Sequence, residues 1–203
     1  TLVNTAVTNV GCNNGNNGAI VLTVTGGNGP INYVLLPNNI SNNNGNFSGL
    51  TAGTYTIAGT DIYGCTLSTV ATITQPATLV FTNVTATSAL CFNAPNGIIN
   101  CPTAGGTQPI TFVISPAGNF VAPNTFNGLA GNVTYTITAT DANGCSTVTT
   151  VYVGQPTQVV INGITNTPVT CNGQANGTLN ANASGGTGLI SYTILPNNIT
   201  NNT

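Results

Sequence analysis

The chain has 203 residues and carries almost no charge, because it contains no Lys, Arg, His or Glu and its only acidic residues are Asp61 and Asp141. In ordinary soluble domains about a quarter of the residues are charged. Without cationic side chains the chain cannot neutralise the phosphates of nucleic acids or the head groups of anionic lipids, so we expect neither as a partner. No apolar run approaches the roughly 20 residues that span a bilayer, and we therefore expect no membrane insertion.

The hydrophobic fraction is 40%, and its spacing favours a folded β protein over a disordered one. Apolar side chains alternate with small or polar ones over 20–24, 31–35, 55–57 and 71–73. Alternation with a period of two predicts strands with one buried face. Asn-Gly pairs such as Asn17-Gly18 separate these runs, and they favour tight turns because both residues tolerate positive φ.

A unit of about 80 residues repeats along the chain. Cys12, Cys91 and Cys171 lie 79 and 80 residues apart, and a similar strand pattern follows each. The other recurring landmarks are Gly26-Gly27, Gly105-Gly106 and Gly185-Gly186, then Gly64-Cys65 and Gly144-Cys145, then Gln75-Pro76 and Gln155-Pro156. We expect modules at 1–76 and 77–156 and the first half of a third module at 157–203, with the natural chain continuing beyond it.

Each complete module has about seven short strands, turn signals every 8–12 residues and no convincing helical period, which is typical of an immunoglobulin-like sandwich. The sequence therefore predicts an all-β fold of tandem immunoglobulin-like β-sandwich modules of about 80 residues. The junctions at Pro76 and Pro156 are short and contain no Gly/Ser-rich linker. We expect them to be semi-rigid, because proline fixes its own φ.

The order of these landmarks resembles the SprB-type repeat of large surface adhesins in gliding bacteria. The motif is carried by Cys12-Asn13, Gly26 to Tyr33, Gly49-Leu50, Thr54 to Ile57, Thr60 to Cys65 and Gln75-Pro76, and again in the second module from Cys91 to Gln155-Pro156. The resemblance implies cell-surface display, export by a type IX secretion route and a role in adhesion or gliding, and it supplies no catalytic residues. The second module departs from the pattern at Cys101 and Pro102, which puts the pairing of that strand in doubt.

The six cysteines lack metal-type C-x-x-C spacing and the chain has no His, which argues against zinc. One disulfide per module is the structural interpretation, and it indicates an oxidising, extracytoplasmic compartment, which agrees with the extracellular, cell-surface location that the resemblance implies. A link from Cys91 to Cys101 would overturn this assignment. The predicted pairs are Cys12–Cys65 and Cys91–Cys145, with Cys171 unpaired in this segment and Cys101 a buried free thiol acting as a small hydrophobe.

Asp61 and Asp141 occupy the same place in an Asp-x-x-Gly-Cys motif, with Gly64 and Gly144 at its fourth position. Asp at the first position and Gly at the fourth suit a type I turn, in which the carboxylate accepts a backbone N–H. The two aspartates are also weak calcium candidates, although calcium prefers six to eight oxygen ligands. We expect no catalytic residues, cofactor or metal, because no side chain offers a base with a pKa near neutral pH.

Three functions agree with these features. The favoured one is a non-enzymatic stalk or filament segment of an extracellular adhesin, for gliding or surface attachment, whose partners are the neighbouring modules of its own chain. A self-assembling filament or surface-layer subunit would instead associate with identical chains, since uncharged edge strands are poorly protected against pairing. A carbohydrate-binding module would bind surface glycans through exposed Thr side chains.

Overall fold

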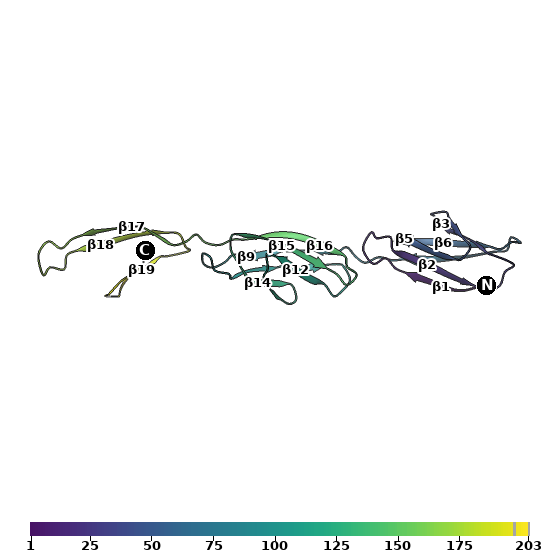
Figure 1. The fold of residues 1–203 in the computed structure, drawn as a ribbon, viewed down its shortest axis with the longest axis horizontal. Helices are drawn as coiled ribbons and strands as arrows, with labels where there is room; N and C mark the ends of the chain where they lie inside the picture. Colours follow the sequence, from purple (N-terminus) through teal and green to yellow (C-terminus); the bar gives the residue numbers. More distant parts are fainter. Residues whose placement is uncertain (197, 203) are drawn as a thin grey trace. The chain divides into compact units, whose positions relative to one another are not determined.

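The computed structural model describes residues 1–196 and 198–202, in which every regular element is a β-strand (Figure 1). The all-β, immunoglobulin-like fold class predicted from the sequence is confirmed. The chain divides into two compact units, of which the first comprises 1–81, 103–112 and 138–147 and the second 82–102, 113–137 and 148–203. These units do not follow the repeat, so the module boundaries at Pro76 and Pro156 stay a prediction.

The first repeat is a sandwich of two antiparallel sheets. One sheet has three strands in the order β1-β2-β5, and the other has four in the order β4-β3-β6-β7. The bounds are β1 Leu2–Thr8, β2 Gly18–Val24, β3 Asn32–Leu36, β4 Ile40–Asn42, β5 Asn46–Leu50, β6 Gly53–Thr60 and β7 Thr66–Ile73. The chain crosses from one sheet to the other after β2, after β4 and after β5, and such crossings between two sheets occur in immunoglobulin-like domains.

Period-two alternation produces the core of this sandwich. In β6 the side chains of Tyr55 and Ile57 are buried, while Thr54 faces solvent. The three-stranded sheet contributes Ile20 from the opposite side, and it is fully buried. Burying side chains of this size stabilises the fold by roughly 1.5–3 kcal/mol each. The complete core comprises Val10, Ile20, Leu22, Tyr33, Leu35, Phe47, Leu50, Tyr55, Ile57, Ala71 and Ile73.

Two tyrosines fix the turn that enters the sixth strand of each complete repeat. The Tyr55 hydroxyl donates to the Thr51 carbonyl oxygen at 3.0 Å. In the second repeat the Tyr135 hydroxyl accepts from the Ala130 N–H at 2.8 Å and lies 3.3 Å from the Ala130 carbonyl. A buried tyrosine that returns to the backbone a few residues upstream is a recurring feature of this fold.

The second repeat has the same succession of strands with one interruption. The strand that corresponds to β2 stops before Cys101-Pro102 and restarts after it, because Pro102 has no N–H to donate. The carbonyl of Pro102 still accepts the Thr82 N–H at 2.9 Å. The departure from the repeat motif at these two residues therefore divides one strand pair into two. The strands are β8 Val80–Phe81, β9 Thr85–Thr87, β10 Gly97–Asn100, β11 Thr103–Ala104, β12 Thr111–Ser115, β13 Asn119–Val121, β14 Thr125–Leu129, β15 Val133–Thr140 and β16 Ser146–Val153.

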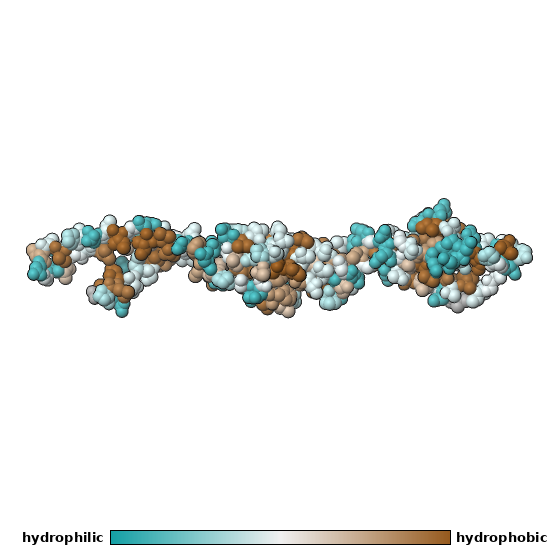
Figure 2. Space-filling view, in the orientation of Figure 1, coloured by the Kyte–Doolittle hydropathy of each residue, from teal (hydrophilic) through white to brown (hydrophobic). Residues whose placement is uncertain are grey.

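The third stretch forms two antiparallel pairs, β17 Val160–Thr167 with β18 Thr178–Ser184 and β19 Ser191–Ile194 with β20 Ile199–Asn202. Its apolar side chains lie on the surface, where hydrophobic residues gather over β17–β19 (Figure 2). Ile164 is 58% exposed and Leu179 is 50% exposed. In the first repeat the face of β2 that carries Ile20 and Leu22 is buried between the two sheets. The corresponding face of the third stretch is not covered.

Candidate functional site

Two local structures recur in the repeats and concern every cysteine except Cys101. We call residues 61–65 and 141–145 the Asp-Cys turns, and residues 11–17, 90–96 and 170–176 the Cys loops. No cluster of three potential metal ligands occurs in residues 1–196 and 198–202. The described part of the chain also contains no helix that is long and apolar enough to cross a membrane.

The first Asp-Cys turn is organised by its aspartate. Asp61 Oδ1 accepts the backbone N–H groups of Tyr63 at 3.0 Å and Cys65 at 2.9 Å. The Gly64 N–H donates to the Asp61 carbonyl at 3.0 Å, and Gly64 has a φ of 81°, which glycine adopts without a Cβ penalty. The Asp61 residue is 7% exposed, and its carboxylate is held by backbone donors.

The second Asp-Cys turn repeats this geometry. Asp141 Oδ1 accepts the N–H groups of Asn143 and Cys145, both at 2.9 Å. The Gly144 N–H donates to the Asp141 carbonyl at 3.0 Å. Asp61, Gly64, Asp141 and Gly144 therefore lie in the turns to which the sequence assigns them.

The other carboxylate oxygen ties each turn to the Gly-Gly segment of the same repeat. Asp61 Oδ2 accepts the Asn28 N–H at 3.1 Å, and Asp141 Oδ2 accepts the Thr107 N–H at 2.9 Å. Hydrogen bonds to the charged form lower the pKa of both groups: the Cys65 N–H contributes most at Asp61 and the Thr107 N–H contributes most at Asp141, while burial opposes the shift. With three of their acceptor positions used by backbone donors, these carboxylates have little capacity left for a calcium ion.

The first two Cys loops are each held by the end of their own repeat. In the first loop the Gly15 N–H donates to the Cys12 carbonyl at 3.0 Å, and the Asn14 N–H donates to Gln75 Oε1 at 2.7 Å. In the second loop the Asn93 N–H donates to Gln155 Oε1 at 3.0 Å. The glutamine of the Gln-Pro pair therefore holds the Cys loop in place by accepting a backbone hydrogen bond, a role that the sequence motif alone did not reveal.

The structure forms a disulfide between Cys12 and Cys145, with 5.7 Å between their Cα atoms. The predicted pairs Cys12–Cys65 and Cys91–Cys145 are therefore wrong. The first Cys loop and the second Asp-Cys turn both belong to the first compact unit, and Asn143 Nδ2 donates to the Gly11 carbonyl at 2.8 Å beside the disulfide. A cysteine of one repeat is thus joined to a cysteine of the next.

The positions of the cysteines in the sandwich explain why Cys12 does not pair with Cys65. In the first repeat Cys12 follows Val10, whose N–H donates to the Thr74 carbonyl beyond the end of β7, whereas Cys65 immediately precedes the start of that same strand. The two cysteines are therefore held toward opposite ends of β7. The eight residues of β7, at about 3.3 Å each, exceed the Cα separation of under about 7 Å that a disulfide tolerates.

Four cysteines are free thiols. Cys65, Cys91 and Cys171 are exposed, whereas Cys101 is buried. The Cys101 thiol donates to the Asn124 carbonyl at 3.0 Å, and burial raises its pKa to about 11. Cys101 therefore stays protonated at neutral pH and behaves as a core residue.

The Gly-Gly segment beside the second Asp-Cys turn is covered by the chain that enters the repeat. The Gly106 N–H donates to the Ala77 carbonyl at 2.9 Å, and a Cβ on Gly105 would collide with the Thr78 carbonyl oxygen. The Cys loop lies beside this segment, and a hollow of about 270 Å³ remains between Cys12, the 76–79 segment and Asp141. We call this arrangement the filled junction.

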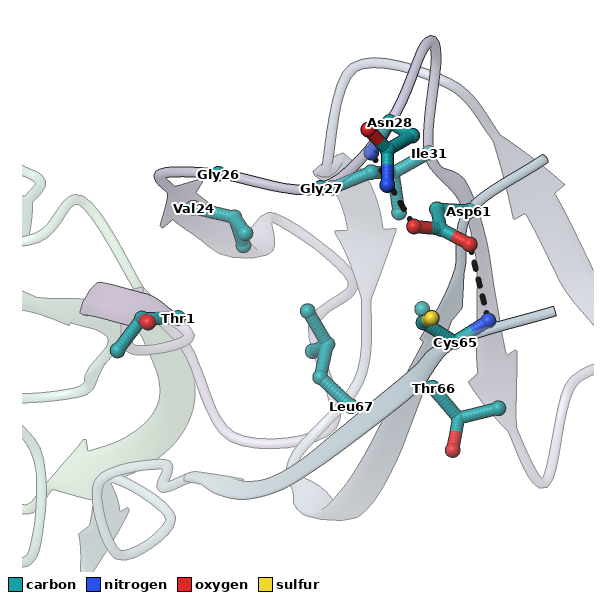
Figure 3. Close-up of a pocket in the computed structure, with 11 residues that line it drawn as sticks. Thr1, Val24, Gly26, Gly27, Asn28, Ile31, Asp61, Cys65, Thr66 and Leu67 are labelled. Carbon is teal, nitrogen blue, oxygen red and sulfur yellow. Dashed lines mark hydrogen bonds between the residues drawn. The ribbon is translucent and has the colours of Figure 1, made fainter. Parts of the chain in front are cut away.

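The first Asp-Cys turn faces an open hollow of about 280 Å³ (Figure 3). Gly26, Gly27, Asp61 and Cys65 line it, together with Leu67. Figure 3 shows Asp61 between the backbone of Asn28 and that of Cys65, as Asp141 lies in the filled junction. The first repeat thus has the same turn as the second.

Comparison with protein families finds the SprB repeat, whose family model matches residues 4–39 and 163–199. The resemblance predicted from the sequence is confirmed for these two segments. A search of the curated proteins finds no match to the chain. The chain contains repeats of the kind found in extracellular adhesins, a type that is generally non-enzymatic, and its disulfide fits an oxidising compartment.

Several solved structures match the chain at low identity. A C-terminal 282-residue fragment of intimin, solved in complex with the intimin-binding domain of its translocated receptor, is 12% identical over 80% of this chain and 67% of the fragment, with a TM-score of 0.44. Sidekick-1 immunoglobulin domains 1–5 are 10% identical over 92% of this chain and 46% of theirs, with a TM-score of 0.40. Drosophila OTK extracellular domains 3–5 are 13% identical over 91% and 74%, with a TM-score of 0.34.

Proposed function

We propose that this chain, two segments of which match the SprB repeat, is a force-resistant stalk segment of an extracellular adhesin. Its partners in this role are neighbouring repeats of the same chain. Export by a type IX route and service in gliding or surface attachment, which the resemblance to SprB-type repeats implies, form part of the proposal. The Cys12–Cys145 disulfide is the observation that carries it.

A stalk transmits tension between its ends, and this disulfide changes the path that tension takes. Force applied to the two ends of the chain passes from Cys12 to Cys145 through the S–S bond. The 133-residue span between these cysteines is thereby removed from the force path, and it includes strands β2–β7 and most of the second repeat. A covalent bypass of this kind lets the folded repeats stay intact while the chain is pulled.

The disulfide also stabilises the fold at rest. In the chain-entropy model, closing a loop of this length contributes about 5 kcal/mol. The chain has no cationic side chain with which to form ion pairs. The disulfide therefore supplies stability that other domains gain in part from ion pairs on their surfaces. An uncharged surface is in turn insensitive to salt, which suits a protein exposed to variable surroundings.

The stalk function is tested by display on a bacterial surface. A known binding domain is placed at the end of this chain, and beads that carry its ligand are captured under flow. We expect more beads to be retained than with a Gly/Ser linker of equal length, and we expect Cys12→Ser to lower retention toward the level of the linker. Retention equal to that of the linker with the intact chain would contradict the proposal.

A further inference from the structure

The filled junction is held together by contacts that do not involve sulfur. Asn13 Nδ2 of the first Cys loop donates to the Pro76 carbonyl at 3.0 Å. The next residue, Ala77, accepts the Gly106 N–H at 2.9 Å. The Cys loop, the entering segment and the Gly-Gly segment are therefore linked one after another by hydrogen bonds. None of these bonds needs the disulfide.

Asn143 connects the second Asp-Cys turn directly to the first Cys loop. Its Nδ2 group donates to the Gly11 carbonyl at 2.8 Å and to Thr107 Oγ1 at 3.0 Å. Cys145 Sγ lies 3.5 Å from the same Gly11 carbonyl oxygen, and Gly11 immediately precedes Cys12 in the sequence. One carbonyl group therefore contacts both the Asn143 amide and the sulfur that is bonded to Cys12.

The aspartate of the turn sets how the Asn143 amide and the Cys145 sulfur lie relative to each other. Asp141 Oδ1 accepts the N–H groups of both residues at 2.9 Å. Asp141 Oδ2 accepts the Thr107 N–H at 2.9 Å, and the Ala142 N–H donates to the Thr107 carbonyl at 3.0 Å. The turn is thus attached to the Gly-Gly segment at two points, and Asn143 extends from a backbone whose position is fixed.

The Cys loop holds the Gly11 carbonyl in a defined place as well. The Gly11 N–H donates to Asn17 Oδ1 at 3.0 Å, and the Gly15 N–H donates to the Cys12 carbonyl at 3.0 Å. The loop is therefore closed by bonds within itself. The acceptor for Asn143 is in position without any covalent link between the repeats.

We propose that Asn143 is a positioning residue, which docks the first Cys loop on the second Asp-Cys turn and thereby selects Cys145 as the partner of Cys12. The chain has six cysteines, so an oxidant can produce many different pairings. Docking raises the effective concentration of one thiol at the other, and the docked pair then forms its disulfide in preference to the others. The same docking lets the bond re-form after it has been reduced.

The oxidation itself needs a disulfide oxidant, such as oxidised glutathione. One thiolate of the pair attacks the oxidant, takes up one glutathione and releases the other as a thiol. The second thiolate then displaces the bound glutathione, and the S–S bond forms. In total the two thiols lose two protons and two electrons, and the oxidant becomes two reduced thiols. Asn143 takes no part in these steps and acts only through the position of Cys145.

The effective concentration of the Cys12–Cys145 pair measures the docking. The three exposed free cysteines are replaced by Ser, the chain is equilibrated in glutathione redox buffers, and the oxidised fraction is read by mass after alkylation. Asn143→Ala should lower the effective concentration at least about fivefold, which corresponds to the loss of one hydrogen bond of ordinary net strength. Asn143→Asp, which keeps the shape but has no N–H to donate, should lower it as well.

Two further variants separate the docking bond from other effects of substitution. Thr107→Val removes the hydroxyl that accepts from the Asn143 amide, and it should lower the effective concentration by a smaller factor. Asn132→Ala is the matched control, because Asn132 is an exposed asparagine of the same repeat whose side chain accepts the Tyr152 hydroxyl instead. This control should leave the effective concentration unchanged.

A merely structural role would lower stability without changing which thiols pair. In the chain with all six cysteines, oxidation should give mainly the Cys12–Cys145 peptide after digestion with chymotrypsin. Asn143→Ala should at least double the share of Cys12 that is bonded to other cysteines. Circular dichroism of the reduced chains should be identical, because Asn143 is exposed.

An unchanged effective concentration in Asn143→Ala, an equal loss in Asn132→Ala, or unchanged partners of Cys12 would overturn the proposal. This role of Asn143 does not depend on the stalk function. The fully oxidised Asn143→Ala chain still contains the disulfide, so it should retain beads under flow as well as the parent chain does. The two proposals therefore fail separately.

Discussion

At the scale of single residues, each complete repeat depends on one buried carboxylate. Asp61 and Asp141 are 7% and 5% exposed, and each accepts three backbone N–H groups from two separate turns. Burial of an anion without a cation is tolerated because backbone donors supply the compensation. This explains how a chain without Lys or Arg retains charge at these two positions.

The lowered pKa values give stability a defined dependence on pH. The folded pKa of both aspartates lies below the value of about 3.9 in the unfolded chain. Their contribution is therefore present above about pH 4 and is lost as pH falls through the folded pKa. We expect the melting temperature to be constant between pH 5 and 7 and to fall below pH 4. The Asp61→Asn/Asp141→Asn double variant should start lower and lose that acid-dependent decline; a parallel decline in the variant would show that other groups cause it.

The tyrosine at the start of β6 provides a second residue-scale prediction. Tyr55→Phe removes a hydroxyl that donates to the Thr51 carbonyl in a buried position, and we expect it to lower the free energy of unfolding by about 1 kcal/mol. Tyr63→Phe removes a hydroxyl from a side chain that is 75% exposed and should change stability by less than about 0.5 kcal/mol. Urea denaturation of both variants measures the difference, and equal effects would contradict this role for Tyr55.

At the scale of elements, the Gly-Gly segment and the chain that enters the repeat fit only without a side chain. Gly105 and Gly144 both have positive φ, of 73° and 84°, but a Cβ on Gly105 would meet the Thr78 carbonyl, whereas a Cβ on Gly144 would meet nothing within 4 Å. Gly144→Ala should therefore cost only the left-handed conformation, about 1–2 kcal/mol. Gly105→Ala should cost more, because it also displaces the entering segment. Thermal unfolding of the two variants compares them, and an equal loss would show that the segment does not pack as described.

The strands could be predicted from the sequence because apolar and polar side chains alternate along each strand. Ile20 and Leu22 in β2 and Tyr55 and Ile57 in β6 are buried as their spacing indicates. The interruption at Pro102 could also be anticipated, since proline donates no hydrogen bond. The Asp-x-x-Gly-Cys turns could be predicted too, because the aspartate and the glycine that form each turn lie within the same five residues.

The disulfide could not be predicted in this way. Spacing places one cysteine near each end of a repeat, and the simplest pairing closes the repeat on itself. Which cysteines meet depends on which end of the sandwich each one occupies, and Cys12 and Cys65 lie toward opposite ends of β7. The sequence did contain one relevant signal. Each complete repeat has an Asp-Cys turn at one end and a Cys loop at the other, so the Cys loop of one repeat can meet the Asp-Cys turn of the next.

At the scale of the whole molecule, the account depends on a covalent link that runs from one repeat to the next. A link within each repeat would stabilise the modules separately and leave their junctions to the peptide chain alone. The link between Cys12 and Cys145 protects the junction itself, and it removes most of two repeats from the force path. These two arrangements predict different extensions when the chain is pulled.

Single-molecule force spectroscopy of the chain, tethered at both ends, distinguishes a disulfide between repeats from disulfides within each repeat. Without reductant, the 133-residue span between Cys12 and Cys145 should contribute no extension. When reductant is added under tension, one release of roughly 480 Å should follow cleavage of this bond, at about 3.6 Å per residue. Two separate releases of roughly 190 Å each, as bonds within the repeats would give, or full extension without reductant, would contradict the account.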